Sequence, residues 1–131
     1  MKWLAFLMMA ALAAAPAYGQ TGRVHGAWLQ TAPTWAVTPD NPWTVMIFNA
    51  DGSFCVGTKK DARYAIGTYI FDGSRMVTTS TSTGRVTART VEPGGSGRLV
   101  MHDPQLDEPV IMVRTDMFAG CAALKTHQGA Q

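Results

Sequence analysis

The sequence has few charges, few cysteines and no apolar run long enough to span a membrane. Of its 131 residues, 11 are lysine or arginine and 9 are aspartate or glutamate, and the basic residues are scattered singly. Surfaces for nucleic acid or anionic lipid need clustered basic residues, so neither partner is expected. The apolar run at 3–15 is shorter than the about 20 residues that a membrane-spanning helix requires.

That run instead fits a secretory signal peptide. Lys2 precedes it and Pro16 ends it, and the small residues that follow allow cleavage near Ala17 or Gly19. We therefore expect residues 1–19 to be a signal peptide and the mature protein to be secreted or periplasmic. No membrane insertion is expected after cleavage.

The remainder has the length of one domain. We expect residues 20–124 to form a single domain, residues 125–131 to be a flexible C-terminal tail, and the protein to be monomeric. Without Lys2, ten basic residues face nine acidic ones, so the mature chain is almost neutral.

Only Cys55 and Cys121 are present, and both lie in the exported part. In an oxidising compartment, such a pair most simply forms a disulfide. Two buried free thiols, or a metal pair that lacks its other ligands, are the alternatives.

Short segments rich in Val, Ile, Thr and aromatic residues alternate with Gly, Pro and Asp clusters, a pattern typical of all-β proteins. Asp51-Gly52 and Asp72-Gly73 are the strongest hairpin signals. The expected strands are 22–30, 43–49, 53–58, 62–71, 75–79, 85–91, 98–102 and 109–115. Tight turns imply an antiparallel meander of seven or eight strands, and closing it into a small barrel removes its edges. A β-sandwich is the alternative.

Three strands carry more specific expectations. Segment 43–49 is apolar on both faces, which predicts a strand covered from both sides. Gly67 suggests a bulge or sharp bend in its strand. In segment 85–91, alternation predicts a half-buried strand with a polar outer face.

Residues able to do chemistry form no recognisable motif. His25, His102 and His127 lie in different segments without metal-ligand spacing, and no G-x-S-x-G nucleophile motif occurs. We therefore expect a non-enzymatic protein with no cofactor and no metal.

A family resemblance follows from the turns. G-A-W at 26–28, F-N-A-D-G-S-F at 48–54, G-T-Y-I-F-D-G-S at 67–74 and P-V-I-M-V-R at 109–114 resemble the small bacterial lipocalin-like (calycin) domains. The resemblance implies a lipocalin-like barrel, a closing cation–π pair of Trp28 and Arg114, and non-enzymatic binding of a small hydrophobic molecule or a protein.

The expected function is therefore that of a lipocalin-like binding protein. Aromatic and Met side chains on strands either fill the core or line a ligand site. The candidate ligand-binding residues are Trp35, Trp43, Tyr64, Tyr69 and Met76. The alternative is an exported inhibitor of an enzyme such as a protease, with the Pro-rich loop 31–42 docked in the enzyme's cleft.

Overall fold

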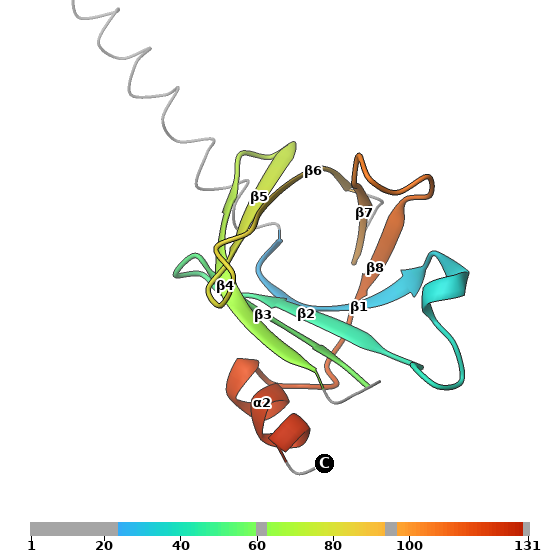
Figure 1. Cartoon of the computed structure of the whole chain (residues 1–131), viewed down its shortest axis with the longest axis vertical. Helices are drawn as coiled ribbons and strands as arrows, with labels where there is room; N and C mark the ends of the chain where they lie inside the picture. The colour runs from blue at the N-terminus through green and yellow to red at the C-terminus, as the bar shows by residue number, and fades with distance from the viewer. Residues whose placement is uncertain (1–23, 60–62, 94–96, 130–131) are drawn as a thin grey trace, which may run out of the picture.

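The computed structural model describes residues 24–59, 63–93 and 97–129. Its strands form one closed antiparallel barrel in which each strand pairs with its neighbours in sequence and β1 pairs with β8 (Figure 1). The strands are β1 (Gly26–Ala32), β2 (Thr44–Phe48), β3 (Ser53–Thr58), β4 (Tyr64–Phe71), β5 (Arg75–Ser80), β6 (Val86–Pro93), β7 (Arg98–His102) and β8 (Val110–Arg114). The predicted all-β meander barrel is confirmed.

Two predictions concern the ends of the chain. The predicted signal peptide, 1–19, lies outside the described residues. Residues 125–129 of the predicted C-terminal tail belong to helix α2 (Cys121–Gly129). Within the described part of the chain, no helix has the length and apolar character needed to cross a membrane.

The two Asp-Gly hairpins form as predicted. The Asp51 carboxylate accepts hydrogen bonds from the Ser53 hydroxyl (2.6 Å) and backbone N–H (2.9 Å), and the Asp72 carboxylate accepts from the N–H groups of Arg75 (2.7 Å) and Ser74 (2.9 Å). These bonds lower the pKa of Asp51, chiefly through the Ser53 hydroxyl, and of Asp72, chiefly through the Arg75 N–H. Each carboxylate therefore fixes its own turn.

The inner core fills the barrel with large apolar side chains that alternate along the strands with outward-facing residues. Its members are Val24, Trp28, Phe48, Phe54, Tyr69, Phe71, Met76, Val91, Leu99, Met101 and Met112. Gly67 pairs in regular register with Phe54 and Ser80, which excludes a bulge, the first of the two predicted alternatives. A Cβ on Gly67 would lie 2.6 Å from the Phe54 ring, and the glycine therefore makes room for that ring.

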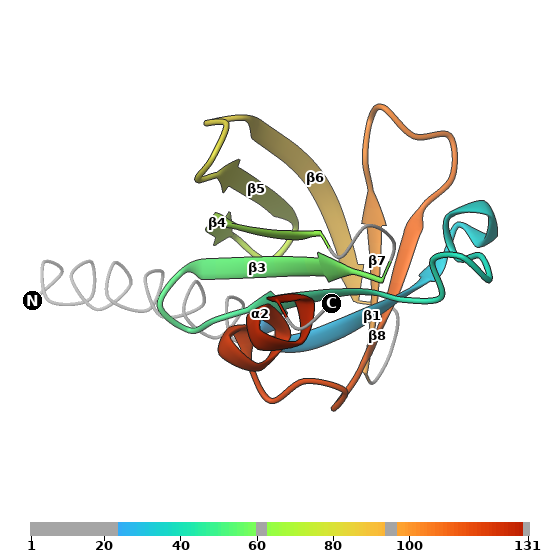
Figure 2. The same ribbon diagram turned by 60° about the horizontal axis from the view of Figure 1, so that its bottom comes forward.

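An outer core lies between the barrel wall and α2. Val45, Ile47 and Cys55 point outward from β2 and β3 and pack against Leu124. This explains why segment 43–49 is apolar on both faces: one face meets the inner core and the other meets the helix, as predicted. Figure 2 shows α2 beside the β1–β3 wall.

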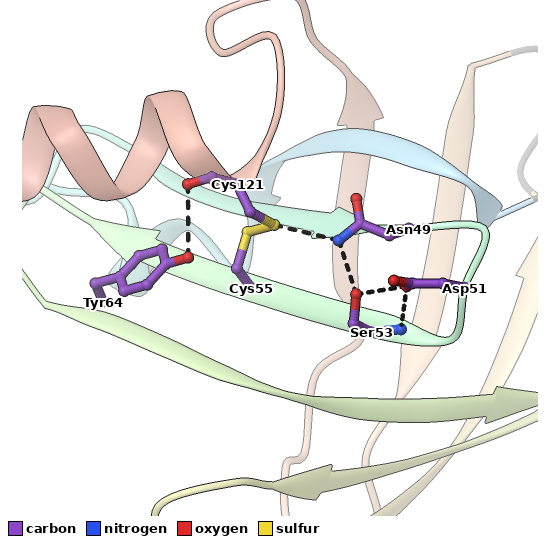
Figure 3. Close-up of a disulfide and its surroundings, with 6 residues drawn as sticks. All are labelled: Asn49, Asp51, Ser53, Cys55, Tyr64 and Cys121. Carbon is purple, nitrogen blue, oxygen red and sulfur yellow. Dashed lines mark hydrogen bonds between the residues drawn. A yellow bond between two sulfur atoms is a disulfide. The ribbon is translucent and has the colours of Figure 1, made fainter.

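Helix α2 is held by three kinds of contact. The predicted disulfide joins Cys55 to Cys121, the first residue of the helix (Figure 3). Near the other end, Gln128 Nε2 donates to the carbonyls of Thr58 and Arg63, each at 2.7 Å. Between them, a Cβ on Gly57 would lie 2.7 Å from Leu124, so the absence of a side chain there allows the helix to approach the sheet closely.

Candidate binding site at the open end of the barrel

The two ends of the barrel differ in how they are sealed. At the closed end, where β2, β4, β6 and β8 finish, the Trp28 indole N–H donates to the Val24 carbonyl at 2.9 Å. The Arg114 guanidinium carbon lies 4.2 Å from the centroid of the Trp28 ring. This is the closing contact that the family resemblance implied for the pair.

Two aromatic rings extend this seal into the interior. Phe48 and Tyr69 meet edge to face with their ring centroids 5.0 Å apart. The Tyr69 hydroxyl donates to the Asn49 carbonyl at 2.8 Å, and burial, followed by the nearby charge of Asp51, raises the pKa of Tyr69. The closed half of the barrel is therefore a packed core.

At the open end, where β1, β3, β5 and β7 finish, the interior is less completely covered. Ala65 pairs with Val56 and has the same strand parity as the buried Gly67 and Tyr69, so it faces inward, yet it is exposed. Met46, Val56 and Val110 on the same inner surface are only partly buried. Solvent therefore reaches an apolar inner surface here.

A polar cluster lies beside this surface. Arg89 Nε donates to Asp103 Oδ2 at 3.2 Å, with the two side chains 25% and 10% exposed, and Arg89 Nη1 lies 3.5 Å from the Thr78 hydroxyl. The other Asp103 oxygen accepts from the Gln105 N–H at 2.9 Å. The Arg89 charge is therefore paired and held at the mouth of the barrel.

The direction of the Arg89 side chain shows that the predicted polar outer face of segment 85–91 is wrong. Arg89 pairs with the buried Met76 and shares a face with the buried Val91, so it points inward. Val86 and Ala88, on the alternate face, point outward. A polar face can line the interior here because Asp103 pairs with the arginine and water reaches the mouth. Alternation identified the two faces without identifying the buried one, and Asp103 lies 14 residues away from Arg89.

The connection between β1 and β2 carries an exposed aromatic residue at the same end. It contains the short 3-10 helix η2 (Thr34–Ala36), in which the Ala36 N–H donates to the Pro33 carbonyl at 3.1 Å. Further along, the Asn41 N–H bonds the carbonyl and hydroxyl of Thr38, each at 3.1 Å. The Trp35 side chain is 63% exposed on this internally bonded loop.

The five predicted ligand-binding residues lie in three different places. Trp35 is exposed at the open end, whereas Tyr69 and Met76 are buried in the inner core. Trp43 and Tyr64 are on the outside of the wall: the Trp43 ring packs 5.5 Å from Phe118 and 5.7 Å from His127, and the Tyr64 hydroxyl lies 3.5 Å from the Cys121 carbonyl (Figure 3). The structure does not gather the five residues into one pocket.

The predicted loop and the histidines have separate surroundings. Loop 31–42 includes η2 and borders the open end. His102 lies 3.5 Å from Glu92 on the outside of the wall, and His127 is part of α2. Over residues 24–59, 63–93 and 97–129, no three His, Cys, Asp or Glu side chains are grouped as a metal site would require.

Comparisons with protein-family models, with curated proteins and with solved structures found no match for this chain.

Proposed function

We propose that this protein is an exported, non-enzymatic, lipocalin-like barrel that binds a protein partner at its open end, with Trp35 as the anchoring side chain. The observation that carries the proposal is the 63% exposure of Trp35 on an internally hydrogen-bonded loop. Protein-binding surfaces are enriched in tryptophan, and a few such residues usually contribute most of the binding energy.

Three features support the wider description. The disulfide suits an oxidising compartment, in agreement with a signal peptide at 1–19. An eight-stranded closed meander and a cation–π contact between Trp28 and Arg114 suit a lipocalin-like domain. The packed closed half of the barrel favours contact through the rim over a deep internal ligand site.

Inhibition of an enzyme such as a protease is one form that this partner binding takes. The prolines of loop 31–42 limit the conformational entropy that the loop loses on binding. Trp35 then occupies a pocket of the enzyme, and loss of the side chain weakens inhibition and binding together.

A second function, binding of a small apolar molecule, is favoured by a different observation. The inner surface at the open end is apolar at Met46, Val56, Ala65 and Val110 and is reached by solvent. A ligand there contacts the wall just above the packed core. Native mass spectrometry of the protein from its own exported fraction tests this function as an added mass that is lost on denaturation.

Site-specific photo-crosslinking tests the protein-partner proposal. A photoreactive amino acid replaces Trp35 in one version and Ile70, which is 73% exposed on the outer wall of β4, in the control. We expect a discrete cross-linked protein from position 35 in the native exported fraction and none from position 70. The purified partner should bind the Trp35→Ala variant at least about tenfold more weakly, the loss typical of an anchor residue. Identical products from both positions, or none from position 35, would contradict the proposal.

A further inference from the structure

Strand β6 has a neighbour on both sides along only part of its length. It pairs with β5 from Thr79↔Val86 to Arg75↔Thr90, but its pairing with β7 begins only at Thr90↔His102 and runs to Pro93↔Leu99. Strand β7 ends at His102. In the part of the chain that the structure describes, residues 86–89 of β6 therefore pair with a strand on one side only.

The hydrogen-bond pattern identifies which backbone groups face the open side. The Ser80 N–H donates to the Arg85 carbonyl (3.0 Å) and the Val91 N–H donates to the Ser74 carbonyl (2.6 Å). The direction of the backbone N–H and C=O groups alternates from residue to residue along an antiparallel strand. The backbone groups of odd-numbered β6 residues therefore bond to β5, and those of even-numbered residues point away from β5. The N–H and C=O groups of Val86 and Ala88 therefore point to the open edge. Thr90, two residues after Ala88, is the first β6 residue that pairs with β7, where it lies opposite His102.

A groove runs along this edge. Arg85, Val86, Thr87 and Ala88 form one side, and Asp103, Pro104 and Gln105 form the other. The second side does not continue the β7 ladder, because Pro104 has no N–H and the Asp103 carboxylate turns the chain by accepting from the Gln105 N–H. Figure 2 shows the start of β6 and the β7–β8 connection diverging.

We propose that this groove binds an extended segment of a partner protein, which adds to β6 as a further strand. Main-chain hydrogen bonds to Val86 and Ala88 supply affinity, as in other cases of strand addition to a sheet edge. The wall at 103–105 favours a single extended chain, since the edge of a second barrel would bring its own neighbouring strands against that wall.

The two faces of β6 define the chemistry of that segment. On the outside, Val86 is 62% exposed, and Ala88 pairs with Val77, so an added strand meets apolar neighbours there. On the inside it meets Thr87 and Arg89. Because Asp103 already pairs with Arg89, the segment alternates apolar residues with hydroxyl residues. The long, exposed Arg85–Gln105 hydrogen bond (3.4 Å) spans the groove and opens on binding.

This site goes beyond the proposed function, because β6 can accept a strand whether or not Trp35 contacts a partner. Variants distinguish the surface around Trp35 from the groove at β6. The Trp35→Ala change should leave strand addition at β6 unaltered, and a change at Ala88 should leave cross-linking from position 35 unaltered.

Amide hydrogen exchange of the full mature protein, measured by NMR, is the first test and needs no variant. The probe is a capped peptide that alternates valine with threonine, and the control has the same composition with the alternation scrambled. We expect the alternating peptide to slow exchange at Val86 and Ala88 by at least about tenfold at saturation. Protection of both amides before peptide is added, changes confined to the Trp35 loop or the barrel interior, or equal effects of the two peptides would overturn the proposal. Protection that appears with increasing protein concentration alone, together with a dimer mass, would also overturn it by assigning the edge to a second copy.

A pair of variants provides the second test. Ala88→Pro removes the N–H that faces the groove without removing a bond to β5, whereas Ala88→Ser keeps that N–H. We expect the proline variant to bind the alternating peptide about fivefold to tenfold more weakly, the effect of one lost hydrogen bond, and the serine variant to match the wild type. Equal affinity of the three proteins would overturn the proposal. If the proline variant does not fold, the exchange measurement decides alone.

Discussion

The guanidinium of Arg114 covers the ring of Trp28 while its Nη1 donates to the carbonyl of His25, so one side chain at the end of β8 connects to the start of β1 and to the residue before it. The contact reinforces the β1–β8 seam, where the barrel closes. It lies at the end opposite the two proposed binding surfaces.

We expect Arg114→Lys to lower the free energy of unfolding by about 1–2 kcal/mol, because lysine loses the planar stacking on Trp28 and the fixed bond to His25. Urea denaturation provides the measurement. Arg98→Lys, an exposed change on the neighbouring strand, is the control and should alter stability little. Equal effects of the two substitutions would show that the contact contributes nothing specific.

Replacing both Cys55 and Cys121 by alanine should cost about 4 kcal/mol, because a loop of this length is no longer closed in the unfolded chain. A thermal melt of the double variant measures the loss as a lower Tm. Wild-type protein with its disulfide chemically reduced is the control, since it loses the cross-link and keeps the sulfur atoms. A melting temperature that does not change in either case would contradict this prediction.

The packing of α2 on the outer core predicts that Leu124 contributes to the stability of the protein. Leu124 is fully buried against Val45 and Ile47, so Leu124→Ala should destabilise the protein by about 2–5 kcal/mol through lost burial and the resulting cavity. Lys125→Ala, on the exposed side of the same helix, should have little effect. Denaturant titration of both variants makes the comparison, and a similar stability for the two would mean that α2 does not pack as described.

The raised pKa of Tyr69 predicts that the stability of the folded protein decreases at alkaline pH. Burial raises its pKa in the folded state, while an unfolded tyrosine ionises near pH 10. Its contribution to stability is therefore complete below about pH 10 and is lost as pH rises through the folded-state pKa. In Tyr69→Phe this part of the pH dependence should disappear, although the bond to Asn49 is lost at every pH. Tyr64→Phe retains Tyr69 and should retain its alkaline loss of stability. Parallel pH–stability curves for wild type and Tyr69→Phe would contradict the assignment.

The barrel could be predicted because its signals are local. Asp51-Gly52 and Asp72-Gly73 fix two hairpins, and the spacing of the apolar segments leaves only short connections between antiparallel strands. The disulfide followed from having only two cysteines in a chain that we expect to be exported. Each of these inferences needed a few neighbouring residues or a simple count.

The location of the site residues depended on contacts between distant segments. Helix α2 was missed because few of its residues meet the barrel, and its position depends on Cys55 and Gly57, more than 60 residues earlier. Without that helix, Trp43 and Tyr64 could not be assigned to the outside of the wall. The inward direction of Arg89 similarly depends on Asp103. The open edge at Val86 and Ala88 was invisible in the sequence because it arises where β7 ends.

Because α2 follows all eight strands in the chain, it is synthesised last, and this order affects how the barrel folds. All eight strands emerge before Leu124, so the outward apolar face at Val45 and Ile47 is uncovered while the barrel assembles. β1 also waits for β8 before its second edge is paired. During this interval the nascent chain exposes an apolar strand face and an unpaired strand edge, the two features that lead folding intermediates to aggregate. Packing of Leu124 on Val45 and Ile47, and the disulfide at the start of α2, then cover this face.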